Sequence, residues 1–236
     1  MAGRCNCAPF DVCEANLDAS LGLGERLSAS NLEYLIQQVR QQGWCVLDAF
    51  FSSTLIDSLC AEVASLLDSD MQQAGVGRKY DHQIVLDTRR DCIQWIDGES
   101  PTREAFLTVM EALRVTLNRA LLLGLFDYEA HFARYYENGF YEKHLDAFKG
   151  QSNRVLSTVL YLNDDWVDGN GGELVIFDEH NPQLELLRIA PKKGRFVVFL
   201  SEDFYHQVNV SKTTRHSIAG WFRVNNSSHA QPDPSR

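Results

Sequence analysis

The chain lacks a long hydrophobic run and an excess of positive charge. No apolar stretch among its 236 residues approaches the roughly 20 residues that cross a bilayer. Its 22 Lys and Arg against 32 Asp and Glu give a net charge of −10, whereas nucleic-acid binding depends on neutralising phosphates with cations. We interpret the one short basic run, 192–195, as a turn between strands. The sequence therefore argues against a membrane protein and against a nucleic-acid-binding protein.

The chain also lacks a secretory signature and the cysteine spacing of a metal-binding module. Residues 1–20 do not show the charged-then-apolar order of a signal peptide, so we expect a cytoplasmic protein. Three of the six cysteines, Cys45, Cys60 and Cys92, lie in apolar or amphipathic segments and are predicted to be core thiols. The other three, Cys5, Cys7 and Cys13, have no partner at zinc-finger spacing, and we assign them no role.

Composition and patterning predict one globular domain with two unpatterned ends. The chain is 44% hydrophobic and 23% charged, as in soluble globular proteins. We expect a flexible N-terminal extension over 1–29, a single domain over 30–224 and a disordered polar tail over 225–236. Within the domain, 30–127 is predicted to be helical support and 128–224 a β core.

The hydrophobic period separates these two parts. Apolar residues at helical spacing predict helices over 32–42, 53–73 and 101–123. Short strands are predicted at 44–50 and 91–96. From residue 128 the period becomes 2, which predicts a series of further strands. These are 128–136, 155–163, 173–177, 184–190, 195–200, 205–210 and 215–224.

Short strands at this spacing are typical of a sandwich or barrel. Helices that precede such strands fit helices packed on one face of a β core. The predicted fold is therefore α+β and mostly β: a double-stranded β-helix, or jelly roll of the cupin type, with N-terminal helices packed on one sheet. The irregular segment 74–92 is long for a connection inside a compact domain, and we interpret it as a lid over a site.

A His-x-Asp pair, His144 and Asp146, and the distant His206 form the ligand set of the 2-His-1-carboxylate facial triad, which holds Fe(II) and leaves positions open for O2 and a cosubstrate. Residues i and i+2 of a strand share a face, so His144 and Asp146 can reach one metal ion. Arg215 follows His206 by nine residues and supplies a permanent cation that can grip a carboxylate. Two neutral imidazoles and one carboxylate leave the iron a net positive charge, which suits an anionic 2-oxo acid.

Joint placement strengthens this interpretation, since His-x-Asp pairs also arise by chance. In a jelly roll, the start of the β core and a late strand can converge at one mouth. The connection over 208–214 is short enough for a hairpin, so we expect neighbouring strands to carry His206 and Arg215. Strand alternation should point His216 away from the pocket, and His131 is predicted to be structural.

Several stretches between residues 89 and 224 resemble those of a known enzyme family, in addition to the triad. They are Arg89–Ile96, Ala133–Asp146, Arg154–Trp166, Gly171–Phe177 and His206–Trp221. Through them the chain resembles the Fe(II)- and 2-oxoglutarate-dependent prolyl 4-hydroxylases, most closely the hypoxia-inducible-factor type and its bacterial relatives. The N-terminal 88 residues match the family only in pattern. The segment 74–90, which should select the protein substrate, diverges from the family.

The resemblance implies roles for further residues. Around the cosubstrate it places Tyr135, Leu174 and Trp221, with Tyr161 beside Arg215 at the distal carboxylate of 2-oxoglutarate. At the substrate mouth it places Tyr141, Trp95, Arg154 and Asp91, and Asp91 is expected to pair with Arg154 as the lid closes. For Tyr141, Leu174 and Trp221 the alternative is ordinary core packing.

The resemblance also implies a reaction and a kind of partner. It implies Fe(II), with 2-oxoglutarate and O2 as cosubstrates, ascorbate as an optional reductant, and an oxygen-sensing role. The expected substrate is a prolyl residue in an exposed loop of another protein, and for a bacterial chain the resemblance suggests elongation factor Tu. Two alternatives stay open: an oxygenase of the same fold that acts on a small molecule, and a non-catalytic jelly-roll binding protein.

Overall fold

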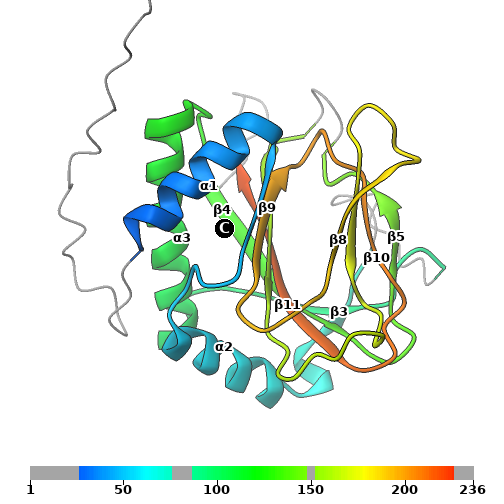
Figure 1. Cartoon of the computed structure of the whole chain (residues 1–236). Helices are drawn as coiled ribbons and strands as arrows, with labels where there is room; N and C mark the ends of the chain where they lie inside the picture. Colours follow the sequence, from blue (N-terminus) through cyan, green and yellow to red (C-terminus); the bar gives the residue numbers. More distant parts are fainter. Residues whose placement is uncertain (1–26, 76–86, 148–151, 226–236) are drawn as a thin grey trace, which may run out of the picture.

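The computed structural model describes residues 27–75, 87–147 and 152–225. Two antiparallel sheets face each other, and helices cover the outer side of the larger one (Figure 1). This arrangement confirms the predicted double-stranded β-helix with helices packed on one sheet. The segments predicted as an extension and a tail lie almost wholly outside the described residues. Most of the predicted lid, 76–86, lies outside them as well.

Two of the three helices lie within three residues of their predicted bounds, 32–42 and 101–123. Helix α1 (Ala29–Gln42) buries Leu32, Leu35 and Val39, and it ends at Gly43, whose φ of 79° is the left-handed conformation that favours glycine. Helix α3 (Pro101–Leu121) begins with a proline in its first turn. The Ser100 side chain caps this helix by accepting a hydrogen bond from the Arg103 backbone N–H.

Helix α2 (Ser53–Ser65) is eight residues shorter than predicted, so the prediction of a helix to residue 73 was wrong. The apolar period continues through Leu66 and Leu67, but Leu66 takes an extended conformation. The Arg134 guanidinium donates to the backbone oxygens of Val63 and Leu66 and so satisfies the end of the helix from outside. The chain then forms a 3-10 turn, η2 (Asp68–Asp70), and a two-residue strand, β2 (Gln72–Gln73).

The larger sheet has seven strands in the order β1-β9-β6-β11-β4-β3-β2. Strand β11 lies at its centre and pairs along its whole length with β4 and for most of it with β6. The other six strands are β1 (Trp44–Leu47), β2, β3 (Cys92–Trp95), β4 (Asp127–Tyr135), β6 (Arg154–Tyr161) and β9 (Phe196–Leu200), with β11 spanning Arg215–Arg223. Apart from β2, which lies where a helix was predicted, each of them was predicted as a strand, with ends within a few residues.

The smaller sheet has four strands in the order β5-β10-β7-β8. They are β5 (Tyr141–His144), β7 (Leu174–Phe177), β8 (Glu185–Ile189) and β10 (His206–Val208). Strand β5 was not among the predicted strands. The expected hairpin between the strands of His206 and Arg215 was also wrong, because β10 belongs to the smaller sheet and β11 to the larger. Both edges of β11 are already paired, so the connection crosses between the sheets.

Three apolar clusters hold these layers together. The largest fills the space between the helices and the seven-stranded sheet, where Phe106, Phe132 and Phe222 are fully buried. The second lies between the two sheets and includes Tyr161, Leu174 and Phe199. A third cluster joins β3 and β4 of the larger sheet to β10 of the smaller one through Ile93, Ala133, Tyr135 and Val208. Of the predicted core thiols, Cys45 is buried, and Cys60 and Cys92 are partly buried.

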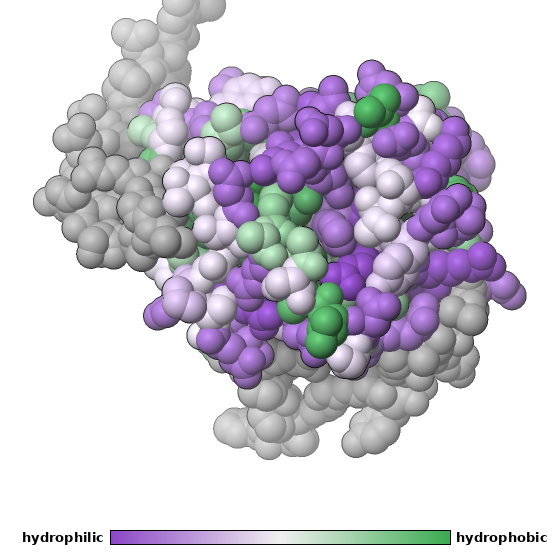
Figure 2. Space-filling model, turned by 90° about the horizontal axis from the view of Figure 1, so that it is seen from below, coloured by the Kyte–Doolittle hydropathy of each residue, from purple (hydrophilic) through white to green (hydrophobic). Residues whose placement is uncertain are grey.

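The face of the molecule seen from below is mostly polar. Seen from below, small apolar areas lie among hydrophilic residues, with no extended apolar face (Figure 2). No helix in the described ranges has both the length and the apolar character needed to span a bilayer.

Candidate active site

The three predicted metal ligands meet between the two sheets. Strands β5 and β10 pair antiparallel with His144 directly opposite His206. Asp146 lies in the bend just after β5 rather than within it, so the expectation that one strand carries both His144 and Asp146 was wrong in detail. One ligand atom from each of the three residues lies within 4.8 Å of the others. The three groups therefore form a compact face for one ion.

Backbone contacts orient both imidazole rings toward that face. Nδ1 of His144 lies 2.7 Å from the Glu142 carbonyl oxygen, and Nδ1 of His206 lies 3.1 Å from that of Phe204. This assigns the proton to Nδ1 and leaves each Nε2 free to bind a metal. The two Nε2 atoms lie 3.7 Å and 3.5 Å from the Asp146 carboxylate oxygens. Such donors suit Fe(II) in a facial 2-His-1-carboxylate site.

The charge states also fit a metal site. Burial lowers the pKa of His206 to about 4, with help from neighbouring His144, so the ring stays neutral. Burial alone raises the pKa of Asp146, but His206, His144 and Arg154 outweigh that effect and hold it well below its usual value. A neutral imidazole and an ionised carboxylate are the forms that ligate a cation.

A serine pair supports the carboxylate. The Ser157 hydroxyl on β6 donates to Asp146 Oδ2 over 2.6 Å and lies 2.9 Å from the Ser201 hydroxyl. Both serines are fully buried. Sequence reasoning missed them, although strand alternation places Ser157 on the same face as Tyr161, four residues later. A hydrogen bond of this kind fixes the orientation of a ligating carboxylate.

Arg215 is a buried cation without an ionic partner among the described residues. It is 2% exposed, and its guanidinium donates to the Gly172 carbonyl oxygen and to the Ser217 hydroxyl. Gly172 has a φ of +65°, and a Cβ there would approach the Arg215 side chain within 3.2 Å. This position beside the guanidinium therefore requires glycine. A buried charge is costly unless an anion meets it, which indicates an anionic ligand.

Two tyrosines flank this cation. The Arg215 guanidinium lies 4.8 Å from the Tyr135 ring centre and 5.1 Å from that of Tyr161. The Tyr161 hydroxyl is buried beside Arg215, yet it has no hydrogen-bond partner of good geometry. Burial raises the pKa of both phenols, so both stay protonated and able to donate. A carboxylate placed here would satisfy Arg215 and Tyr161 together. Leu174 lies nearby in the same apolar cluster as Tyr161.

The residues expected at the mouth form two separate groups. In the first, the Tyr141 ring stacks on His144 with centres 3.6 Å apart, and the Arg89 guanidinium lies 4.4 Å from the Tyr141 ring centre. Asp91 pairs in a bidentate manner with Arg89. The pair between Asp91 and Arg154 that the resemblance implies is not formed in this structure.

The second group is centred on Trp221. The Arg154 guanidinium lies 3.5 Å above the Trp221 ring and pairs with Glu129. His131, whose pKa is lowered to about 4 by burial, sits between Trp95 and Trp221. Sequence reasoning missed Glu129 and described His131 only as structural. The Trp221 indole N–H is buried and has no partner within the described chain.

His216 points to the opposite side of the sheet, as predicted. Its Nε2 accepts a hydrogen bond from the Arg134 Nε on the helix-facing side. The neighbouring Arg215 points to the inner side of the sheet, where it contacts Gly172 and Tyr161, so strand alternation separates the two residues as expected.

The comparisons with known proteins agree with this geometry. The family model of the 2OG-Fe(II) oxygenase superfamily matches residues 130–223, which hold every metal ligand and Arg215. A crystal structure of a Pseudomonas putida prolyl-4-hydroxylase is 34% identical, with a TM-score of 0.72, and the match covers 82% of this chain and 98% of that one. The chain belongs to the prolyl hydroxylases of the 2OG-Fe(II) oxygenase superfamily.

Two other relatives extend the comparison. Human Egl nine homolog 1 is 31% identical over 201 residues, a match that covers 81% of this chain and 46% of that protein. The chain spans about half the length of the curated Egl nine homolog 1 relatives that it matches. A Trichoplax adhaerens prolyl hydroxylase, solved with a hypoxia-inducible-factor peptide, has a TM-score of 0.72 at 21% identity and supports the fold alone.

Proposed function

We propose that this oxygenase uses Fe(II), 2-oxoglutarate and O2 to hydroxylate a prolyl residue in a protein substrate. The single observation that carries the proposal is the buried Arg215, which has no ionic partner among the described residues and lies beside the buried Tyr161 hydroxyl, in a chain that also brings His144, Asp146 and His206 together. A dicarboxylate that reaches both the metal and Arg215 suits this arrangement. The similarity to the Pseudomonas putida prolyl-4-hydroxylase supports proline as the target.

The chain's own residues bind and orient, and none is needed as a general acid or base. His144, Asp146 and His206 would hold Fe(II), which supplies the oxygen chemistry when bound. Arg215 and Tyr161 would hold the 5-carboxylate of 2-oxoglutarate, with Tyr135 and Leu174 as walls. These walls exclude water from the reacting atoms. On the substrate side, we propose that Trp221, Tyr141, Trp95 and Arg154 contact the peptide, with Asp91 acting through its ion pair at the mouth.

We further propose elongation factor Tu as a substrate, with its target proline in an exposed loop. Such a substrate implies the cytoplasm, and ascorbate is an optional reductant for the iron. The test is succinate release by protein loaded anaerobically with Fe(II), with and without purified elongation factor Tu. Mass spectrometry of the recovered factor should show the gain of one oxygen on a proline. Succinate release with other prolyl peptides but not with the factor would reject this substrate and keep the reaction. No prolyl-dependent succinate release would reject the reaction.

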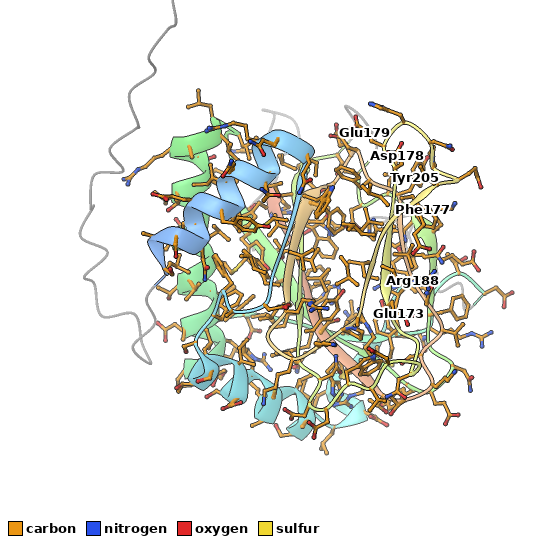
Figure 3. All side chains as sticks on the ribbon, viewed as in Figure 1. Glu173, Phe177, Asp178, Glu179, Arg188 and Tyr205 are labelled. Carbon is orange, nitrogen blue, oxygen red and sulfur yellow. The ribbon has the colours of Figure 1, made fainter. Side chains whose placement is uncertain are left out.

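Arg215→Lys should weaken 2-oxoglutarate binding about tenfold or more, because an ammonium lacks the planar fork that holds a carboxylate in two hydrogen bonds. The measurement is a 2-oxoglutarate titration of metal-loaded protein. Arg188→Lys is the matched control. Arg188, labelled in Figure 3, belongs to the edge strand β8 and makes a bidentate pair with Glu185 at the surface. Equal cosubstrate affinity in both variants would argue against Arg215 as the anchor.

A further inference from the structure

Four charged side chains alternate in sign along the inner side of the larger sheet. Arg154 on β6, Glu129 on β4, Arg223 on β11 and Asp127 on β4 form a continuous row. One Glu129 oxygen accepts from Nε and Nη2 of Arg154 over 3.1 and 2.9 Å, and the other lies 3.2 Å from Arg223 Nη1. Asp127 accepts from Nε and Nη2 of Arg223 in a bidentate pair. Glu129 is therefore the member that joins the two arginines.

Burial within this row is uneven. The side chains of Glu129 and Arg223 are each 8% exposed, whereas that of Arg154 is 22% exposed. A carboxylate buried to this extent needs both cations to offset its lost hydration. Arg154 is thus the most exposed member of the row. Its Nη1 makes no hydrogen bond to any residue in the described ranges.

This end of the row forms a wall close to the metal site. The Arg154 guanidinium lies 3.5 Å above the Trp221 ring. Across the sheet Trp221 is paired with Glu129 on one side and with Ser157 on the other. Ser157 in turn donates to the metal ligand Asp146. Two cross-strand steps therefore connect Glu129 to the metal ligands, and the Trp221 ring lies between them.

We propose that Glu129 is a positioning residue that fixes Arg154 flat over Trp221 and neutralises its charge at the substrate mouth. The inference rests on the proposed prolyl hydroxylation. A guanidinium that is already paired with a carboxylate still offers the N–H groups of Nη1, which suit a neutral peptide carbonyl. It has little charge left to attract a carboxylate of the substrate. Glu129 thereby makes the site selective for neutral residues beside the target proline.

The test compares Glu129→Gln with the wild type in succinate release. The probe is a blocked peptide that carries the exposed prolyl loop of elongation factor Tu. With Gln, Arg154 loses its charged acceptor, so the peptide KM should rise about tenfold, as for the loss of one charge-assisted hydrogen-bond partner. The turnover number should stay within about twofold, as should peptide-independent 2-oxoglutarate consumption, because the metal and cosubstrate contacts do not change.

Charge selectivity gives a second readout that a purely structural role would not move. A version of the same peptide with Glu next to the proline should be a poorer substrate than the neutral peptide for the wild type. Glu129→Gln should reduce or reverse that preference, because the Arg154 charge is then free to pair with the peptide. An unchanged peptide KM together with an unchanged preference overturns the proposal. If peptide-independent turnover falls as much as peptide-dependent turnover, the proposal is also overturned, because the metal site would then have moved.

Controls separate this inference from the fold and from the proposed reaction. Glu62→Gln is the control for the loss of a carboxylate that pairs with a buried arginine far from the site. It removes one ionic partner of Arg103, 2.6 Å away in the helical layer, and should leave the peptide KM unchanged. If Glu129→Gln does not fold, Glu129→Asp keeps a negative charge between the two arginines but shortens the reach to both, so Arg154 is no longer fixed over Trp221 and a rise in KM is again expected.

A substrate-free measurement keeps the inference testable if no peptide is hydroxylated. Acrylamide should quench the Trp221 fluorescence more strongly in Glu129→Gln, measured as the difference from the same variant with Trp221→Phe. Equal quenching of Trp221 in wild type and variant would show that Glu129 does not hold Arg154 over the ring.

Discussion

At the residue scale, the contact that most directly affects the metal site is one the sequence pattern did not reveal. The Ser157 hydroxyl fixes the Asp146 carboxylate over 2.6 Å in a fully buried setting. Ser157→Ala should lower the affinity for a divalent metal about tenfold, the lower end of the effect of lost outer-sphere partners. The measurement is an anaerobic Mn2+ titration followed by electron paramagnetic resonance.

A neighbouring residue provides the control. Thr158→Ala changes the next residue of β6, which faces the helices and bonds the Tyr128 hydroxyl instead. That variant should bind Mn2+ like the wild type. Equal affinities for Ser157→Ala and the wild type would remove Ser157 from the metal site.

At the residue scale, sequence spacing predicted the metal ligands but not the residues that support them. The His-x-Asp pair and the distant His206 could be identified from the sequence because their spacing matches a known ligand set and their places in the predicted β core allow them to converge. Ser157 and Glu129 carry no such signal, since neither belongs to a spacing that marks a metal site. Their roles arise from cross-strand pairing, which sets Trp221 opposite both. The sequence predicts which residues share a face of one strand, but not which residue of the adjacent strand lies opposite.

At the scale of elements, the end of α2 depends on a side chain from β4. Arg134 donates to two carbonyl oxygens at that end and also bonds His216 and Asp68. Arg134→Lys should lower the free energy of unfolding by about 2 kcal/mol, because hydrogen bonds from a charged donor to buried acceptors are lost. The measurement is urea unfolding followed by circular dichroism.

The comparison variant is Arg119→Lys, at an exposed position in the last turn of α3. It should unfold within about 0.5 kcal/mol of the wild type, as is usual for surface substitutions. Similar losses for the two variants would mean that Arg134 does not stabilise the helix end.

Element boundaries were predictable where the signal was local. Gly43 ends α1, and Ser100 with Pro101 begins α3, and each of these signals lies within a few residues of the boundary. The end of α2 was predicted too late because its stop comes from Arg134, about 70 residues further along the chain. The same limitation explains the expected hairpin before Arg215. Loop length permitted it, but β11 was already paired with β4 and β6.

For the whole molecule, buried histidines make stability depend on pH. Burial lowers the pKa of His131 to about 4, while an unfolded chain protonates histidine near 6.5. The unfolded state therefore binds the proton first, so stability is full above pH 6.5 and falls as the pH drops toward 4. His131→Gln should flatten this dependence by up to about 1.4 kcal/mol per pH unit, one proton's worth.

The measurement is the free energy of unfolding of metal-free protein in urea at several pH values between 7 and 4.5. His180→Gln, at an exposed loop position, is the matched variant and should keep the wild-type slope. Identical slopes for the wild type and His131→Gln would show that His131 titrates normally in the folded protein.

The overall architecture was predictable because it follows from a change of period along the chain. Helical spacing before residue 128 and alternation after it specify a helical layer and a β sandwich. The assignment of strands to sheets was not predictable, because alternation alone does not tell which strands pair. Strand β5 was missed since its four residues, Tyr141–His144, include only one apolar side chain.

The two halves of the active site belong to different sheets. The histidine ligands are on β5 and β10, whereas Arg215 and Tyr161 are on β11 and β6. A dicarboxylate bound at one end to the ion and at the other to the guanidinium therefore spans the sandwich. Its binding free energy opposes separation of the sheets. If 2-oxoglutarate binds as proposed, we expect it also to slow proteolysis of the folded protein, because the ligand ties the two sheets together.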